Sequence, residues 1–524
     1  MKHKLQHRIL ASLALIFTLI VILWIFASII VFFRTGAEKY AFEPVPDTFY
    51  ENHTPFVSLQ TSPRFTGGLN SDKIMEQVTD AYLKSWRSYN HSLEHNSFHL
   101  LEDHFSESLF QDVRKNIENN KTSGSHVIQI DAAHNLNFHL VSTDQQFVAF
   151  TDKQVPVYKH VYKDNQLVLD ISTIVDIDVL MLLEEGFWKV FKWVQTVSEV
   201  EPEETVADDI NNFSVKGNDL LKDNQPFESK GVNYYPAENP WFEMWLNFDK
   251  ETIDKDFKRI QSFGLNTIRV FIPYPVFGGS NVEPQRLLQL DTVMQLANKY
   301  DLYLIPTLFD FNPDYSHLSY TNADKHLRSI VKRYTDNKAI LAWDIKNEPD
   351  LDFDNHSKTK VLQWLSYIVD RIKFYDPNHL VTIGWSNADY ADLLEDKVDI
   401  VSFHFYKPAD QLKNDISMLK NKVGNRVLYL QEFGLSTFNW FPGTQGKAER
   451  KQTALLEYVI ESCAEENISY AFWTLNDFHQ APPYVFGKLP WRRWPQTQFG
   501  IINKKGKEKR AAQIFENNRS PSKN

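Results

Sequence analysis

The sequence contains a single cysteine, Cys463, in 524 residues. No disulfide can therefore form within the chain, and a cysteine-based metal site is not expected. Basic residues are also scarce relative to acidic ones: 56 lysines and arginines stand against 67 aspartates and glutamates, a net charge of -11. Because phosphate binding requires a basic face, nucleic acid is not expected as a partner. The histidines are scattered, with no closely spaced ligand pair on one face beyond isolated cases, so neither a metal nor another cofactor is expected.

One long uncharged run stands at the N-terminus, over residues 9–33. It is long enough to span a hydrocarbon core of roughly 30 Å. It ends in Phe32, Phe33 and Arg34 rather than in the small residues of a signal-peptide cleavage site, which favours an uncleaved anchor. Slightly more basic residues precede the run than follow it, which predicts a cytoplasmic N-terminus. Residues 1–40 are thus predicted to form a short cytoplasmic segment and a single-pass membrane anchor, with the rest of the chain outside the cytoplasm.

Residues 41–69 are rich in Pro, Thr, Ser and Gly and are predicted to be a linker. A helical pattern follows, and after Ser123 the apolar period drops to two, which predicts strands. The expected strands are 127–130, 136–141, 146–151, 156–163, 167–178 and 187–196. Helices followed by such a meander resemble the nuclear-transport-factor-2-like cone fold over residues 70–198. No convincing polar constellation stands out there, so the expected role is a spacer or an assembly domain with a protein partner.

Residues 199–212 form an acidic run that is predicted to be a linker, and residues 213–519 are predicted to be a second domain. After a short hairpin pattern, strand-like runs alternate with amphipathic stretches, which predicts parallel strands with crossover helices. Eight such units predict an α/β fold, a (β/α)8 TIM barrel. The expected strands are 231–237, 266–274, 302–311, 340–350, 379–387, 399–408, 426–435 and 468–477. A doubly wound sheet would alternate too, but no Gly-x-Gly-x-x-Gly follows any strand, which removes the dinucleotide-binding alternative.

Functional side chains of such barrels lie at the C-terminal ends of the strands. The run LAWDIKNEPD carries a buried-strand pattern directly into Asn347, Glu348 and Pro349 at the fourth strand end. Glu432 stands at the seventh. Two carboxylates over one pocket are what cleavage of a glycosidic bond requires.

The residues at these strand ends resemble those of the clan-A glycoside hydrolases, the cellulase and endo-β-mannanase superfamily, over about residues 213–515. The matching residues are Arg269, Asn347, Glu348, His404, Tyr406, Glu432 and Trp473. The resemblance implies action with retention on β-linked sugars.

The resemblance also implies roles. Glu348 would be the acid/base, with a raised pKa, and Glu432 the nucleophile. Arg269 and Tyr406 would hold Glu432 by hydrogen bonds that favour its anion. The remaining three would contact substrate or acid: Asn347 the sugar 2-hydroxyl, Trp473 the sugar face as a platform, and His404 the acid/base or a hydroxyl.

Further candidates for the sugar groove come from less specific signals. The family usually has a histidine after the third strand, and here only His317 is available, several residues late. Trp241 and Trp385 are candidates as well, together with Asp310, Trp491 and Trp494. Asp344 is expected to face away from Glu348 and to be structural.

The function expected from these patterns is a membrane-anchored retaining β-glycoside hydrolase that acts on an extracytoplasmic polysaccharide, mannan-like or glucan-like. A transglycosylase would use the same two glutamates and stays open as an alternative. So does a non-catalytic carbohydrate-binding or scaffold protein of a polysaccharide export system, although that alternative predicts the loss of a catalytic carboxylate, and both are present.

Overall fold

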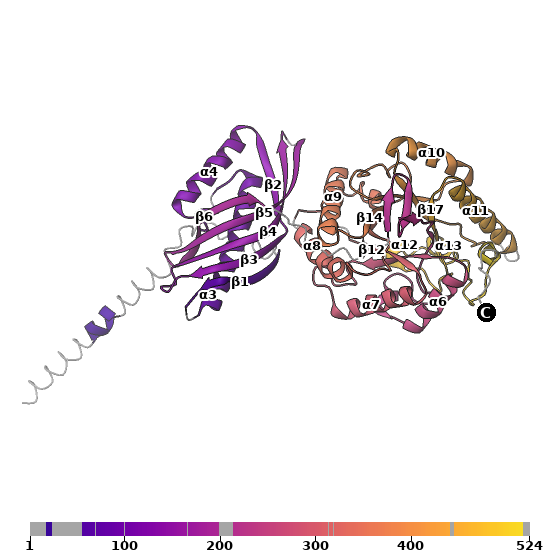
Figure 1. Ribbon diagram of the computed structural model, residues 1–524, viewed down its shortest axis with the longest axis horizontal. Helices are drawn as coiled ribbons and strands as arrows, with labels where there is room; N and C mark the ends of the chain where they lie inside the picture. The colour runs from indigo at the N-terminus through magenta and orange to yellow at the C-terminus, as the bar shows by residue number, and fades with distance from the viewer. Residues whose placement is uncertain are drawn as a thin grey trace, which may run out of the picture. The chain divides into compact units, whose positions relative to one another are not determined.

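The computed structural model describes residues 17–23, 55–68, 70–98, 100–164, 166–198, 213–312, 314–317, 319–440 and 445–516. The chain divides into two compact units, Met1–Pro202 and Glu203–Asn524 (Figure 1). The predicted span at 9–33 lies outside the described residues except for 17–23, which are helical. Within the described part of the chain, no helix combines the length and the apolarity needed to cross a membrane. The predicted acidic linker, 199–212, also lies outside the described residues.

The first unit is a six-stranded sheet with two helices packed against it, chiefly on β2 and β6 (Figure 1). Its order is β1-β3-β4-β5-β6, and β2 pairs with the far half of β4. The elements are β1 (Phe56–Thr66), α3 (Ser71–His95), α4 (Glu107–Thr122), β2 (Ser125–Asp131), β3 (Ala133–Val141), β4 (Phe147–Lys163), β5 (Gln166–Glu184) and β6 (Phe187–Val197). One side of α3 is buried through Val78, Tyr82 and Trp86, at the helical spacing of four.

Two predictions for this unit are wrong in part. Residues 56–66 belong not to a linker but to β1, which pairs in parallel with β3. Most positions of β1 are exposed or half-exposed, so its apolar residues show no period of two. The strands expected at 146–151 and 156–163 are one long strand, because β4 passes through a register irregularity between Asp152 and Val155, where Gln154 has a φ of 52°. The resemblance to a cone fold stays a prediction.

The absence of a polar constellation in the first unit is also a wrong prediction. His134 lies between two carboxylates, with Nε2 2.8 Å from Asp131 and Nδ1 2.6 Å from Asp152. All three side chains are fully buried. Tyr82 donates to Asp152, and Asn90 to Asp131, so both carboxylates have further partners. The chain brings them together from β2, β3 and β4, which no local spacing reveals.

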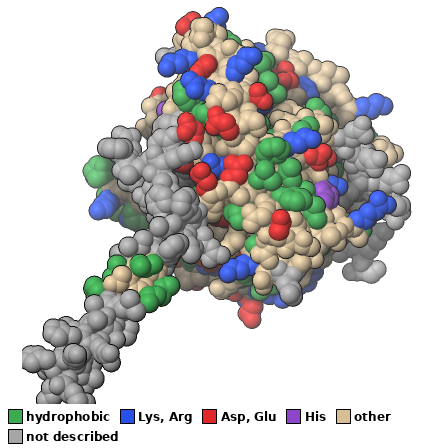
Figure 2. Space-filling view, turned by 90° about the vertical axis from the view of Figure 1, so that its left-hand side faces the viewer, with side chains coloured by type: hydrophobic (Ala, Val, Ile, Leu, Met, Phe, Trp, Pro, Cys, Tyr) green, Lys and Arg blue, Asp and Glu red, His purple; other side chains and the backbone are tan. Residues whose placement is uncertain are grey.

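The surface shown in Figure 2 mixes acidic and basic side chains and exposes a group of apolar side chains among them. Strand β6 contributes exposed apolar residues to the surface of the first unit: Phe187, Phe191, Val194 and Val197, the last 77% exposed. These four residues are spread over the whole length of β6.

The second unit contains a closed barrel of eight parallel strands, and this confirms the predicted barrel (Figure 1). Its strands are β10 (Lys230–Asn233), β11 (Thr267–Pro273), β12 (Tyr303–Asp310), β13 (Ala342–Asn347), β14 (Leu380–Trp385), β15 (Ile400–Phe405), β16 (Val427–Phe433) and β17 (Ser469–Trp473). Almost every strand residue is buried, as expected where helices cover the outside and side chains fill the inside.

The helices surround the strands. They are α5 (Glu243–Leu246), α6 (Lys250–Ser262), α7 (Pro284–Lys299), α8 (Ser319–Ile330), α9 (Lys358–Tyr375), α10 (Leu412–Val423), α11 (Gln445–Glu465), α12 (Pro483–Phe486), α13 (Pro490–Gln496) and α14 (Gln513–Glu516). Asp249 caps α6 by accepting from the N–H groups of Glu251 and Thr252, and Ile253, Phe257 and Ile260 form its buried side.

The amino-terminal end of the barrel is closed by a small sheet of three strands, β7 (Phe213–Lys216), β8 (Asp219–Lys222) and β9 (Gln225–Pro226). Phe213 and Leu220 of this sheet are buried in one cluster with residues near the starts of the barrel strands, among them Leu341 and Val427. Access to the barrel is therefore left at its carboxyl-terminal end, where Glu348 and Glu432 lie.

Candidate active site

The backbone after β13 places Glu348 at the mouth of the barrel. Glu348 has a φ of 47°, in the left-handed region, and its N–H donates to the carbonyl of Gly384 on β14 over 2.7 Å. Non-glycine residues rarely adopt this conformation, and one that does often marks a functional site. Pro349 then starts a short 3-10 helix, Pro349–Asp352. The Asn-Glu-Pro break thus ends the strand and projects one carboxylate into the barrel opening.

Glu348 and Glu432 face each other across this opening. One oxygen of each carboxylate and one ring nitrogen of His404 all lie within 4.8 Å of one another. The Glu432 side chain is 11% exposed and that of Glu348 is 24% exposed. The two acids are thus close together and almost removed from water.

Glu432 is held by two donors, one on each oxygen. Arg269 Nη1 lies 3.2 Å from Oε2, and the hydroxyl of Tyr406 lies 2.6 Å from Oε1. Both donors favour the anionic form, because hydrogen bonds to a charged carboxylate are stronger than those to the neutral acid.

Arg269 is fixed in turn by residues of neighbouring strands. Its Nε and Nη2 lie 3.0 and 2.7 Å from Oδ2 of Asp344, and Nη2 also donates to Asn347 Oδ1 over 2.8 Å. Nη1 donates to Asn233 Oδ1 over 3.1 Å. The guanidinium is fully buried, so its orientation toward Glu432 is set by these contacts rather than by solvent.

Glu348 has a different neighbour, the ring of His404. Nδ1 of His404 lies 2.9 Å from Oε1 of Glu348. Burial lowers the pKa of His404 to about 4, so the ring is neutral near pH 7. A neutral ring can accept a hydrogen bond from the acid form of Glu348 or donate one to its anion, whereas a charged ring would hold Glu348 ionised.

The surroundings of the two acids therefore affect their pKa values differently. Burial raises the pKa of Glu348, and Arg269 opposes this only from a distance. Burial raises the pKa of Glu432 as well, but Arg269 and the hydrogen bond from Tyr406 oppose it. Since two neighbouring acids titrate as a pair, the first proton goes to the one with fewer donors, which is Glu348.

Aromatic rings line one side of the opening. Trp473, at the end of β17, is 8% exposed. Its ring centroid lies about 6 Å from those of Tyr235, Trp241, Phe271 and Phe478. Aromatic faces of this kind suit the apolar face of a pyranose ring.

Comparison with known proteins agrees with this arrangement. Residues 220–479 match the model of the cellulase family, glycosyl hydrolase family 5. The barrel of this chain belongs to the clan-A glycoside hydrolases. The members of this clan are O-glycosyl hydrolases. The N-terminal unit lies outside the match.

Among curated relatives, mannan endo-1,4-beta-mannosidase A of Hypocrea jecorina is 27% identical over 193 residues, which cover 29% of this chain and 43% of the relative. A probable mannan endo-1,4-beta-mannosidase A of Aspergillus oryzae is 26% identical over 281 residues, 45% of this chain and 70% of the relative. Among solved structures, an exo-beta-1,4-mannosidase from Opitutaceae bacterium strain TAV5 has a TM-score of 0.46 at 19% identity and covers 56% of this chain and 59% of its own.

The glycoside hydrolase domain brings together all seven residues expected at the strand ends. Three weaker candidates lie differently. His317 has its ring 5.7 Å from Tyr320 at the start of α8, and Trp385 is 2% exposed with its ring 6.4 Å from Phe353. Trp241 is 4% exposed and belongs to the aromatic group of Trp473. Trp385 therefore offers little surface to a sugar, while Trp241 supports Trp473.

The expectation that Asp344 faces away from Glu348 is wrong. Asp344 is fully buried inside the barrel and binds Arg269, and its Oδ1 accepts from the N–H of Gly384 over 3.0 Å. Residues two and four apart on a strand share a face, so Asp344 and Glu348 have the same parity. That spacing, together with the buried arginine on β11, was the signal that could have identified it.

Two further features of the glycoside hydrolase domain could suggest other functions: the spacing of donor atoms within the site itself, and a second cavity. Glu348, His404 and Glu432 are the one group among the described residues with donor atoms spaced closely enough for a metal ion. Both oxygens of Glu432, however, already accept from Arg269 and Tyr406, and a cation would have to displace these donors or lie beside a guanidinium.

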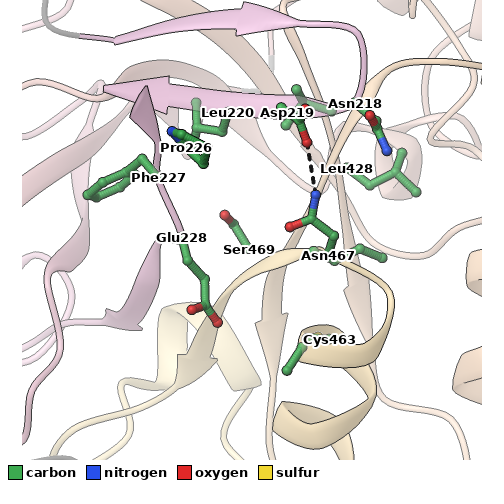
Figure 3. Close-up of a pocket in the computed structure, with 13 residues that line it drawn as sticks. Asn218, Asp219, Leu220, Pro226, Phe227, Glu228, Leu428, Cys463, Asn467 and Ser469 are labelled. Atoms are coloured by element: carbon green, nitrogen blue, oxygen red, sulfur yellow. Dashed lines mark hydrogen bonds between the residues drawn. The ribbon is translucent and has the colours of Figure 1, made fainter. Parts of the chain in front are cut away.

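The second feature is a cavity of ≈ 220 Å³ at the other end of the barrel (Figure 3). It lies between the small sheet and the starts of β16 and β17, and the side chains of Asp219, Glu228, Cys463 and Ser469 border it. Asn467 Nδ2 donates to Asp219 Oδ1 over 3.0 Å across its rim. Because the amino-terminal end of such barrels serves stability rather than chemistry, this cavity is not the active site.

Proposed function

We propose that the chain is a retaining β-glycoside hydrolase that acts on a β-mannan-like polysaccharide. The observation that carries this proposal is the close approach of two carboxylates in unlike surroundings, with oxygens within 4.8 Å. Retaining enzymes have carboxyl groups about 5–5.5 Å apart, whereas inverting enzymes leave about 6.5–9.5 Å for a water. The curated relatives named as mannan endo-1,4-beta-mannosidases favour mannan over glucan.

In the proposed reaction, Glu432 attacks the anomeric carbon while Glu348 gives its proton to the departing glycosidic oxygen. A covalent glycosyl ester on Glu432 results. Glu348, now ionised, takes a proton from water, and the water oxygen attacks the same carbon and releases Glu432. Arg269 and Tyr406 support the anion of Glu432 before and after the reaction.

Asn347 and Trp473 are the substrate-binding residues of this proposal. Asn347 Oδ1 is occupied by Arg269, which leaves its amide N–H groups to face the sugar 2-hydroxyl. Trp473, the last residue of β17, would provide an aromatic face at the mouth of the barrel, where it is grouped with Tyr235 and Phe271. Transfer to a sugar acceptor in place of water would use the same residues, so the product analysis must look for longer chains as well as shorter ones.

We also propose that residues 9–33 anchor the chain in a membrane, with both units outside the cytoplasm. The uncharged run and the basic residues before it support this proposal. The exposed apolar residues of β6 support a protein partner for the first unit. Flotation with lipid vesicles, with the full chain and a chain that begins at residue 41, tests the anchor: only the full chain should float.

The activity is tested with the full chain in detergent on β-1,4-mannan, β-1,4-glucan and xylan. Release of reducing sugar should occur on mannan, and nuclear magnetic resonance of the first product should show retained anomeric configuration. Glu432→Gln and Glu348→Gln should each lower kcat by roughly three orders of magnitude or more on the polymer. An inverted product, or full activity of Glu432→Gln, would refute the proposed mechanism, and no release from any polymer would refute the proposed substrate class.

A further inference from the structure

Asp310 is a carboxylate of the barrel mouth to which the proposed reaction assigns no role. It is the last residue of β12 and is 8% exposed. The Asp310 carboxylate has no hydrogen-bond donor among the residues that the structure describes, whereas its backbone carbonyl accepts from the N–H of Tyr274. A buried carboxylate without a donor is costly, because it has lost its water and gained nothing in return.

Two other acids at this end of the barrel, Asp344 and Glu432, accept hydrogen bonds on both carboxylate oxygens. Asp344 accepts from Arg269, from Thr307 over 2.7 Å and from the N–H of Gly384. Glu432 accepts from Arg269 and Tyr406. Asp310 thus differs from these two acids, because neither of its carboxylate oxygens has a hydrogen-bond donor among the described residues.

Asp310 lies at the same mouth of the barrel as the reacting groups, because β12 is the neighbour of β13 and Glu348 directly follows β13. Burial raises its pKa to about 7, Lys346 and Arg269 oppose that rise, and Glu432 adds to it. Lys346 comes from the next strand, and its ammonium is 2.8 Å from the carbonyl of Asn312. Burial and the charge of Asp310 both raise the pKa of Tyr235, which belongs to the aromatic group of Trp473. At the end of β12, the carboxylate therefore lies at the mouth of the barrel where Glu432 would meet its sugar.

We propose that Asp310 is a specificity-determining residue that accepts hydrogen bonds from hydroxyl groups of the sugar bound next to Glu432, and that it thereby excludes uronic acids from this pocket. The proposal rests on the proposed glycoside hydrolase function. A neutral sugar supplies the missing donors and removes the cost of an unpaired buried acid.

Exclusion of uronic acids follows from the balance of charge. The four acids Glu348, Glu432, Asp344 and Asp310 face two cations, Arg269 and Lys346. Arg269 is already shared between Glu432 and Asp344. The ammonium of Lys346 is held by the carbonyl of Asn312 and lies 3.5 Å from Asp352. A sugar carboxylate placed here would therefore meet four acids and two cations that are already engaged. Replacing Asp310 by a neutral amide removes one repulsive charge and adds a donor, so it should favour an acidic sugar while weakening a neutral one.

The test compares two polymers that differ only in the oxidation of C6, β-1,4-mannan and β-1,4-mannuronan. The full chain, Asp310→Asn and Asp310→Ala are assayed on oligomers of both. Asp310→Ala should lower kcat/KM on the mannan oligomer by about 10- to 100-fold, largely through KM. Asp310→Asn should shift the mannuronan-to-mannan ratio of kcat/KM upward by at least about 10-fold.

A matched control is Asp256→Asn. Asp256 is a half-buried acid on α6 of the same domain, and it already accepts from Tyr234 and Asn476. The ratio for the two oligomers should be the same in Asp256→Asn as in the wild type. Asp310 variants whose KM values and ratio equal those of the wild type overturn the proposal.

A wild type that cuts neither oligomer would count against the proposed function, and titration calorimetry with mannotriose and trimannuronate then decides the role of Asp310. Tighter binding of mannotriose by the wild type, lost by about 10- to 100-fold in Asp310→Ala, supports the role. Binding of neither oligomer, or equal binding by wild type and variants, overturns it. Circular dichroism of each variant excludes the trivial case of a misfolded barrel.

Discussion

The hydroxyl of Tyr406 lies 2.6 Å from Oε1 of Glu432, while Arg269 occupies the other oxygen of the same carboxylate. The two donors differ in kind. Arg269 is fully buried and fixed by Asp344, whereas Tyr406 is 47% exposed and stands at the edge of the opening. Tyr406 can therefore be removed with little effect on the barrel, which makes it the better probe of how Glu432 is kept ionised.

Tyr406→Phe should move the acidic limb of the pH–rate profile to higher pH. The hydrogen bond from Tyr406 lowers the pKa of Glu432, so its loss raises that pKa and requires a higher pH to form the anion. We expect kcat/KM on mannan oligomers to fall by about 10- to 100-fold near pH 6 and by less at higher pH. An unchanged acidic limb would show that Arg269 alone holds Glu432.

Asp344→Asn should impair both stability and activity. It removes the fully buried one of the two anionic partners of Arg269 and leaves only Glu432, and removal of one member of a buried pair typically costs about 3–5 kcal/mol. Urea unfolding of the second unit measures this cost, and kcat/KM should fall because Arg269 is no longer held toward Glu432. Thr307→Val, which removes a neutral donor to the same oxygen of Asp344, is the control and should cost about 1–2 kcal/mol.

The barrel and its two glutamates could be predicted from the sequence because both follow from short-range patterns. Alternating strands and helices determine the topology, and the topology determines that the ends of β13 and β16 meet at one mouth. The partners of Glu432, Arg269 and Tyr406, were instead implied by the resemblance to the clan-A glycoside hydrolases, since Arg269 is the third residue of β11 rather than its last.

Other features depend on contacts between distant segments and were not predictable in this way. Trp241 was a candidate for the groove, but its loop folds back and buries the ring against Phe478. Asp310 was only one of several groove candidates, since its significance lies in the absence of a donor on neighbouring strands. The two contacts of His134, with Asp131 and with Asp152, join residues from three strands. Strand β1 was hidden because its partner, β3, pairs with it in parallel from a distant part of the chain.

Gly384→Ala should disturb the site through the side chains that surround Gly384. A Cβ at this position would lie 2.6 Å from Gln431 Oε1, 2.9 Å from Arg269 Nη2 and 3.3 Å from His404 Nε2. Gln431 can move, but Arg269 is held by Asp344 and Asn347, so the shift reaches Glu432. We expect a loss of about 1–3 kcal/mol in stability and of about 100-fold in kcat.

Gly446→Ala is the control for this change. Gly446 lies in α11, and a Cβ there would meet nothing within 4 Å. Its activity should equal that of the wild type, and its stability should stay the same or rise by up to about 1 kcal/mol. A fully active Gly384→Ala variant would show that Arg269 tolerates displacement, and the proposed support of Glu432 would then have to rest on Tyr406.

The first unit should lose stability as the pH rises toward 10, because of His134. The carboxylates of Asp131 and Asp152 overcome the effect of burial and raise the pKa of His134 to about 10, against about 6.5 in an unfolded chain. The stabilisation from the charged ring is therefore complete below about pH 6.5 and is lost as the pH rises through about 10. His134→Gln should destabilise the unit by about 3–5 kcal/mol at pH 6, since it leaves two buried carboxylates without a cation, and by less at pH 10.

Pulse proteolysis in urea, with the first-unit fragment identified by mass, measures this difference without interference from the barrel. His126→Gln is the control, because His126 stacks on Tyr162 at 5.0 Å in the same sheet and takes no part in an ion pair among the described residues, so its cost should stay below about 0.5 kcal/mol. If the gap between wild type and His134→Gln were equal at pH 6 and pH 10, His134 would be neutral in the folded unit, and the two carboxylates would have to share a proton instead.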